Sequence, residues 1–339
     1  MEHRDREALG NREKKRGGMG ILRSHRRGSG ICLGVMLVLG SAAGEGRGHT
    51  ELSLDIERIS GKLRNDPDRV DLLVRRGQLF RRDGHPLASM ADLNRAGRLA
   101  PDRWDIVFER AMTMVSLGRD EQADWELTRC LKMHPSLAIG YAERGKIKAR
   151  SGRKAAAVAD LNEAIGIKPS VDWVLLRGRL QEEAGQLDAA AMEYRDAMQR
   201  LNEPVLIRLA LVRVEVARKH FEAALAWIDP ALEGASIKTE WYLRRGDVLT
   251  AAGRLAEARG DLDRALKAAN DALLRRETAI HLVNRAKVLS AMGQRDGAIA
   301  DLRRAEAAAP HYLPARGLLN ELESESGERE QSHFVLRVK

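Results

Sequence analysis

The chain has 339 residues, of which 44% are hydrophobic but only 4% aromatic, and its formal net charge is +9. Most of the apolar residues are Ala and Leu, a composition that favours close-packed helices over a β-sandwich or barrel. A charge of +9 suggests nucleic acid or an anionic surface as partner, but residues 1–43 carry nine Lys/Arg against four acids and supply +5 of it. The rest of the chain is therefore an unfavourable candidate for nucleic-acid binding.

The N-terminal segment has the order of a secretory signal. Basic residues precede the apolar run Ile31–Gly40, small residues follow it, and this order matches the n-region, h-region and cleavage site of such a signal. The run is too short to span a bilayer as an ordinary helix. We expect residues 1–43, starting at Met1 or Met19, to be cleaved near Ala43, which exports a mature chain without a transmembrane helix to the periplasm or the outside. The alternative is a cytoplasmic or membrane-anchored protein whose basic arm contacts nucleic acid or acidic lipid.

Beyond residue 50 the sequence repeats with a period of 34 residues. Prolines and glycines recur at this interval, at Pro67, Pro101, Pro135 and Pro169 and at Gly84, Gly118 and Gly152. Counted from Val70, each unit has an apolar or aromatic residue at positions 4 and 24, small residues at 8 and 20, and glycine at 15. Because such a glycine turns with positive φ at a helix end and the proline ends the next helix, each unit is expected to be a helix-turn-helix.

This pattern resembles the tetratricopeptide repeat, a helix-turn-helix unit of 34 residues. The resemblance covers nearly all of residues 51–324 and implies an all-α fold: an α-solenoid of about seven units forming a right-handed superhelix with terminal capping helices. The units are expected at residues 70–103, 104–137, 138–170, 171–204, 205–238, 239–278 and 279–312. A linker is expected at 44–50, an unpaired helix at 51–65, a capping helix at 313–324 and a flexible tail at 325–339.

Two units depart from the pattern. The fifth is degenerate, because Lys219 or a neighbour stands where the other units have the turn glycine. In the sixth, the interval from Gly253 to Gly293 stretches to 40 residues, which predicts a longer second helix that runs to about Arg276.

Six of the seven units carry an arginine at position 7 and an acid at position 23, places where the family usually has leucine and an aromatic residue. We expect each arginine to pair with the acid of its own unit and to fix the register of the two helices, since buried pairs add little stability. The pairs are Arg76 with Asp92, Arg110 with Glu126, Arg144 with Asp160, Arg177 with Glu193, Arg245 with Asp261, and Arg285 with Asp301. The fifth unit has Leu211 and Trp227 in these places. The alternative is a row of arginines that reads phosphates.

The sequence contains no catalytic constellation, so we expect a protein that is not an enzyme and needs no cofactor, metal or small-molecule substrate. Its nine histidines are scattered, and Walker, GxSxG and HExxH motifs are absent. Cys130 falls at a small-residue packing position, which predicts a buried and unreactive thiol.

The resemblance also implies a binding surface, because first helices in the family line a concave groove that holds peptides. At the family's groove positions the N-terminal half is mainly basic, with an apolar patch in the middle. The candidate binding residues are Arg75, Arg81, Arg82, Phe108, Met112, Lys146, Arg150 and Arg179. We expect a scaffold or adaptor of a cell-envelope assembly that binds a protein or peptide partner, acidic or C-terminal, with one apolar anchor; ordinary solvated helix faces are the alternative.

Overall fold

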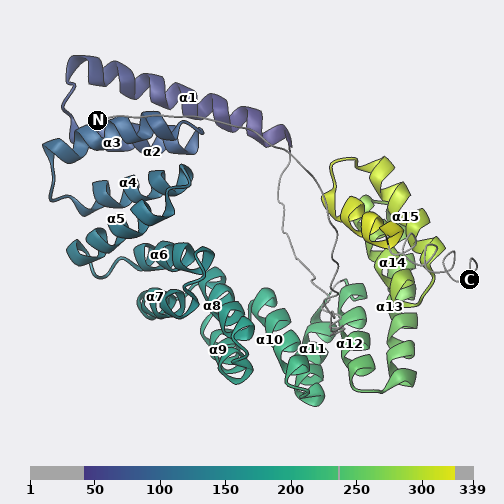
Figure 1. Cartoon of the computed structure of the whole chain (residues 1–339). Helices are drawn as coiled ribbons and strands as arrows, with labels where there is room; N and C mark the ends of the chain where they lie inside the picture. The colour runs from purple at the N-terminus through teal and green to yellow at the C-terminus, as the bar shows by residue number, and fades with distance from the viewer. Residues whose placement is uncertain (1–41, 236, 325–339) are drawn as a thin grey trace, which may run out of the picture. The chain divides into compact units, whose positions relative to one another are not determined.

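The structure is a computed structural model that describes residues 42–235 and 237–324, and within these ranges the regular structure is entirely helical (Figure 1). The chain divides into two units, Met1–His49 and Thr50–Lys339. The first contributes only the beginning of helix α1 to the described residues, and the second contains the helix pairs. The expected signal at 1–43 and the expected tail at 325–339 lie almost wholly or wholly outside the described residues.

Seven helix pairs follow one another in the described part of the chain. The first helices are α2 (Val70–Arg82), α4 (Trp104–Ser116), α6 (Ala138–Arg150), α8 (Val171–Glu183), α10 (Val205–Ala217), α12 (Thr239–Ala251) and α14 (Ala279–Ala291). The second helices are α3 (Pro86–Leu99), α5 (Asp120–Met133), α7 (Lys154–Ile167), α9 (Leu187–Arg200), α11 (Phe221–Gly234), α13 (Leu255–Arg275) and α15 (Arg295–Ala308). From α4 on, each first helix packs against the second helix of its own pair and against the second helix of the preceding pair. This is the all-α solenoid that the repeat predicted.

Helices also stand at both ends of the stack. Residues 313–324 are helical, and α1 (Ala42–Asn65) precedes the first pair. Because α1 begins at Ala42, the linker expected at 44–50 is wrong. Once the packed part of a helix is nucleated, each added residue gains a hydrogen bond at no further nucleation cost, which offsets the glycines of this segment.

The turn within each pair needs a left-handed residue. Six pairs place glycine there, with φ between +70° and +78°, a region that glycine enters without steric cost. In the fifth pair Lys219 takes this conformation with φ +63°. The fifth unit therefore keeps the turn geometry of the other units. Because Lys219 has a side chain, its left-handed backbone conformation is strained.

The core consists of small and aliphatic side chains along the stack. Ala, Leu, Ile and Val dominate the buried residues, and the largest fully buried side chain is Tyr194. One contiguous cluster reaches from Ala138 to Val214, across the third, fourth and fifth pairs. Since neighbouring pairs share buried residues, the stack is held together between units as well as within them.

Candidate protein-binding surface

The exposed side of the first helices of the seven pairs is here called the first-helix face. Contacts join α2 to α4, α8 to α10 and α12 to α14 directly. The eight residues expected to bind a peptide lie on α2, α4, α6 and α8, the first four of these helices. The charge of this face depends on which of its side chains are already paired with acids of the protein itself.

Three of the six basic residues expected to bind a partner are neutralised by acids of the chain itself. Arg81 Nη2 lies 2.9 Å from Glu109, which also accepts a hydrogen bond from Gln78. Lys146 Nζ lies 2.7 Å from Glu143, and Arg150 binds Asp120 through two nitrogens at 2.9 and 3.0 Å. The face is consequently less basic than the sequence predicted, because Glu109 and Asp120 from neighbouring helices and Glu143 from α6 itself cancel part of its charge.

The other three basic residues, Arg75, Arg82 and Arg179, are exposed and form no ion pair within the described part of the chain. Arg75 and Arg82 lie on α2, and Arg179 lies on α8. These guanidinium groups keep their full capacity for a carboxylate, which they bind through paired N–H donors.

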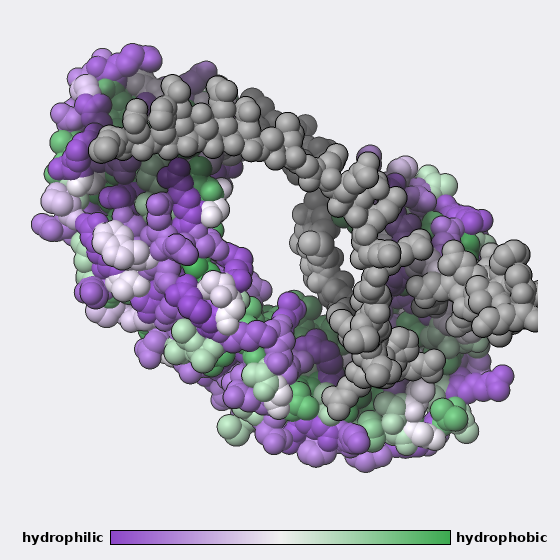
Figure 2. Space-filling model, in the orientation of Figure 1, coloured by the Kyte–Doolittle hydropathy of each residue, from purple (hydrophilic) through white to green (hydrophobic). Residues whose placement is uncertain are grey.

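The expected apolar anchor is only partly available. Phe108 is half-buried and packs against the cluster of Ala111, Ala123, Leu127 and Ile147, and Met112 is also half-buried. Figure 2 shows that hydrophilic residues predominate on the face in view and that apolar residues occur there in smaller groups. A partner would therefore meet charged side chains first and limited apolar surface between them.

The six arginines at position 7 form an internal series, here called the arginine ladder. Each one contacts the acid sixteen residues later, in the second helix of its own pair. Their side chains are only 12–26% exposed. Because these guanidinium groups are partly buried and paired within the protein, the structure offers no row of free arginines to bind phosphates.

The third nitrogen of most ladder arginines reaches the preceding pair, or α1 in the case of Arg76, a contact that the sequence did not predict. Arg76 Nη1 donates to Ser60 at 3.0 Å, Arg144 to Thr128 at 3.1 Å, Arg245 to Asp229 at 3.0 Å and Arg285 to Asn270 at 3.1 Å, and Arg177 donates to Asn162. Each acceptor lies fifteen or sixteen residues before its arginine. In the sequence this spacing is inconspicuous, because four of the five acceptors are uncharged. The contacts show that the ladder joins neighbouring elements of the stack as well as the two helices of each pair.

The type of acid, aspartate or glutamate, determines the geometry of each arginine–carboxylate pair in the ladder. With aspartate, the guanidinium binds both carboxylate oxygens through Nε and Nη2, as in Arg144 with Asp160 at 2.9 and 2.7 Å. With glutamate, in the pairs of Arg110 and Arg177, the arginine Nε is buried without a hydrogen-bond partner among the described residues. The two-point contact therefore depends on the shorter side chain.

The fifth pair replaces the ladder with other polar contacts. Glu215 is fully buried and contacts Arg195 of α9 and Arg218 of its own turn. On the first-helix face, Arg213 binds Glu182 of α8 at 2.8 and 3.0 Å, and the Tyr194 hydroxyl donates to the same carboxylate at 2.7 Å. Burial, reinforced by Glu182, raises the pKa of Tyr194, which therefore keeps its proton and remains a donor.

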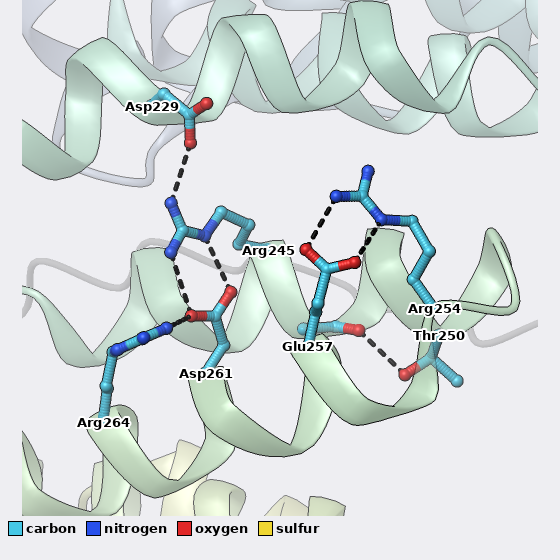
Figure 3. Close-up of polar contacts among 8 residues, drawn as sticks. Asp229, Arg245, Thr250, Arg254, Glu257, Asp261 and Arg264 are labelled. Atoms are coloured by element: carbon cyan, nitrogen blue, oxygen red, sulfur yellow. Dashed lines mark hydrogen bonds and ion pairs between the residues drawn. The ribbon is translucent and has the colours of Figure 1, made fainter.

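A pocket of about 500 Å³ opens beside the ladder, between α11 and α13. Figure 3 shows Arg245 between Asp229 and Asp261, with Arg264 at the same Asp261 carboxylate. Arg254, on the same pocket, binds Glu257 through two nitrogens at 2.7 Å. Each cation of the pocket already has an acid, so the pocket offers no uncompensated charge to an anion.

The described residues offer neither a metal site nor a membrane-spanning helix. Within 42–235 and 237–324, no group of three or more His, Cys, Asp or Glu is arranged to hold a metal ion. None of the helices in these ranges is both long and apolar enough to cross a membrane. Cys130 is fully buried, with its thiol 3.4 Å from the Trp104 carbonyl oxygen.

Comparison with known proteins finds repeats of this kind. Residues 147–284 match the family model of the tetratricopeptide repeat-like domain. The human mitochondrial import receptor subunit TOM70 is 28% identical over 86 residues, which are 25% of this chain and 14% of that protein. Human tetratricopeptide repeat protein 13 is 26% identical over 149 residues, 42% of this chain and 17% of that protein. The aligned segments thus span less than a fifth of either relative.

The fold is also similar to that of two solved structures. A tetratricopeptide repeat protein from Parabacteroides merdae has a TM-score of 0.49 at 18% identity and covers 75% of this chain and 98% of its own. Yeast Tom70 has a TM-score of 0.49 at 15% identity and covers 86% of this chain and 62% of its own. The match over residues 147–284 and the seven helix pairs in the described residues agree, and a repeat fold of this kind supports protein–protein interaction. Over residues 147–284 the chain is thus similar to the tetratricopeptide repeat-like domain.

Proposed function

We propose that the protein is a non-enzymatic scaffold whose first-helix face binds an acidic segment of a partner protein. One observation carries the proposal: Arg75, Arg82 and Arg179 are exposed there without an ion pair in the described chain, while Arg81 and Arg150 beside them are compensated. Uncompensated guanidinium groups steer an anionic partner to the face and bind its carboxylates. The half-buried Phe108 and Met112 supply apolar contact between them.

The test uses charge reversal on two faces of the same stack. Arg82→Glu and Arg179→Glu, each placed in the full chain, should weaken binding of a partner recovered by crosslinking and pull-down by about tenfold or more, as expected for lost charge-assisted contacts. The matched control is Arg98→Glu, because Arg98 is exposed on the second helix α3 and has no ion pair in the described residues. Equal loss in all three variants, or no loss in the first two, would remove the proposal.

We further propose that the protein is exported and acts in a cell-envelope assembly, on the strength of the signal-like order of residues 1–43. Cell fractionation followed by N-terminal sequencing tests this. A mature chain that begins at Gly44 is the expected result. A cytoplasmic protein that keeps its basic N-terminus would instead favour an adaptor whose basic arm contacts nucleic acid or acidic lipid.

A further inference from the structure

The seventh helix pair is displaced along the stack. In the second, third and fifth units the polar partner of the next ladder arginine stands at position 25. In the sixth unit position 25 is Asp263, yet Arg285 binds Asn270, seven residues further along α13. Seven residues of helix are about 10 Å long. The α14 helix therefore packs about two turns beyond the usual place, on the extension that makes α13 the longest of the second helices.

The displaced pair presents four helix ends at one edge. Successive helices of the stack run antiparallel, so the end of α13, the start of α14, the end of α15 and the start of the helix at 313–324 lie on the same side. The end of α13, the start of α14 and the start of the last helix each carry a solvent-exposed aliphatic side chain. Leu274 is 85% exposed, and Ile280 and Leu313 are each 54% exposed. We call Leu274, Arg275, Arg276, Ile280 and Leu313 the tip.

Helix stability does not account for these side chains. An acid in the first turn of a helix is favoured by the helix dipole, and four first helices carry one at position 2, where α14 has Ile280. These acids are Asp71, Asp105, Asp172 and Glu240. Leu274 likewise gains nothing from the core, because it is its neighbour Leu273 that packs into the buried cluster of the last pair. Two other first helices also carry an apolar residue at position 2, Ile139 and Leu206, but these are less exposed, at 38% and 37%. Ile280 therefore exposes more apolar surface than the residue at this position of the other described first helices.

The charge around these aliphatic side chains is positive. Arg275 and Arg276 are exposed and form no ion pair in the described chain, whereas the next acid, Glu277, is compensated by Arg304 at 2.7 Å. The exposed Asp271 lies one turn back on α13. The outermost residues of the tip thus combine apolar side chains with two guanidinium groups that are unpaired within residues 42–235 and 237–324.

We propose that the tip docks on a bilayer surface that contains anionic lipid. Apolar side chains at helix ends can enter the flat boundary between headgroups and acyl chains, to a depth of about 5–10 Å, while adjacent arginines bind headgroup phosphates. The tip projects from the edge of the stack, and its two free arginines complement an anionic surface. A protein partner at the same residues is the alternative that the experiment separates.

The experiment measures binding of the full chain to phosphatidylcholine vesicles with and without one third phosphatidylglycerol. The Leu274→Glu/Ile280→Glu variant should lose at least tenfold in partitioning to the anionic vesicles, since both apolar contacts are replaced by charges that anionic lipid repels. The matched control is Leu255→Glu, because Leu255 is 65% exposed at the opposite end of the same helix, and its partitioning should change less than twofold. Arg275→Ala/Arg276→Ala should lose about 25-fold, or about fivefold per arginine, and only on anionic vesicles.

Hydrogen exchange with vesicles present localises the contact, because the basic N-terminus of the full chain also attracts anionic lipid. Protection of amides around residues 274–282 is the expected result. The proposal is overturned if these amides stay unprotected, or if Leu255→Glu loses as much as the double variant. It is also overturned if the wild-type chain is a dimer in solution that Leu274→Glu/Ile280→Glu converts to a monomer, because the tip would then be a protein interface.

Discussion

Replacing Gly178 with alanine tests how closely the two helices of the fourth pair approach. A Cβ atom built on Gly178 would lie 2.3 Å from Cζ and Oη of Tyr194. The tyrosine ring is fully buried, and its hydroxyl donates to Glu182 at 2.7 Å. The ring therefore cannot rotate away from α8 without losing this hydrogen bond or disturbing the core around it.

The expected magnitude follows from two opposing terms. Carbon atoms in contact normally lie about 3.5–4.0 Å apart, so the helices or the ring must shift by about 1 Å. Overpacking of this kind costs about 1–3 kcal/mol, and alanine regains about 1 kcal/mol of helix propensity. The clash is severe and meets an immobile ring, so we expect Gly178→Ala to lower the free energy of unfolding by about 2 kcal/mol.

Two glycines at the same position of other pairs provide matched controls. At Gly246 the nearest atom to an added Cβ is 3.6 Å away, an ordinary contact, so alanine should stabilise the protein by about 0.5–1 kcal/mol through helix propensity. At Gly145 the nearest atoms lie at 3.2 Å, which predicts an effect between those of the other two variants.

Urea unfolding of the three variants, followed by circular dichroism, measures these differences as shifts of the midpoint at unchanged slope. The slope must be checked, because repeat stacks can lose cooperativity between units. The expected order of midpoints is Gly246→Ala, Gly145→Ala, Gly178→Ala from highest to lowest. If the Gly178→Ala protein is as stable as the Gly246→Ala protein, the contact with Tyr194 does not limit the size of the residue at position 178.

Three further changes test other parts of the stack. Arg76→Leu leaves the buried Asp92 without its partner and should lower the free energy of unfolding in urea by about 3 kcal/mol. The double variant Arg76→Leu/Asp92→Leu should restore most of this loss, and equal stability of the single and double variants would contradict a structural pair. Lys219→Gly relieves the φ of +63° and should raise the free energy of unfolding by about 1 kcal/mol, so an unchanged or lower urea midpoint would show no strain there. Burial, with a contribution from nearby acids, raises the pKa of Cys130 to about 11, so in a Cys32→Ser chain a thiol reagent at pH 8 should label it only on unfolding, and rapid labelling of the folded protein would exclude a buried thiol.

In the arginine ladder, the contacts within each pair could be predicted from the spacing of charged residues, whereas the contacts between pairs could not. The interval of sixteen residues from Arg144 to Asp160 was visible because both ends carry unusual charges for their positions. Thr128, which accepts from the same guanidinium, carries no charge and resembles any surface residue of a helix. Its role depends on how one pair stacks on the next, a relation that the period of the repeat leaves open.

On the first-helix face, too, the sequence shows which residues are basic but not which of them are paired. The sequence places Arg81 and Arg82 side by side at the end of one helix, as equal candidates to bind an anion. In the structure Arg81 is compensated by Glu109 of the next first helix, while Arg82 has no ion pair among the described residues. Whether a given arginine can bind a partner depends on an acid about thirty residues away in the sequence. Only the packing of the helices brings the two side chains together.

The number of helix pairs, their turns and the longer α13 could be predicted from the sequence, because they follow from local rules. These rules are where glycine turns the chain, where proline ends a helix and which residues can be buried. Only the tertiary structure showed that Gly178 is needed for close packing whereas Gly246 has room for a side chain. It also showed that the seventh pair sits two turns further along α13. The physical reason is that local periodicity fixes each helix, whereas distances between helices depend on the side chains that meet across them.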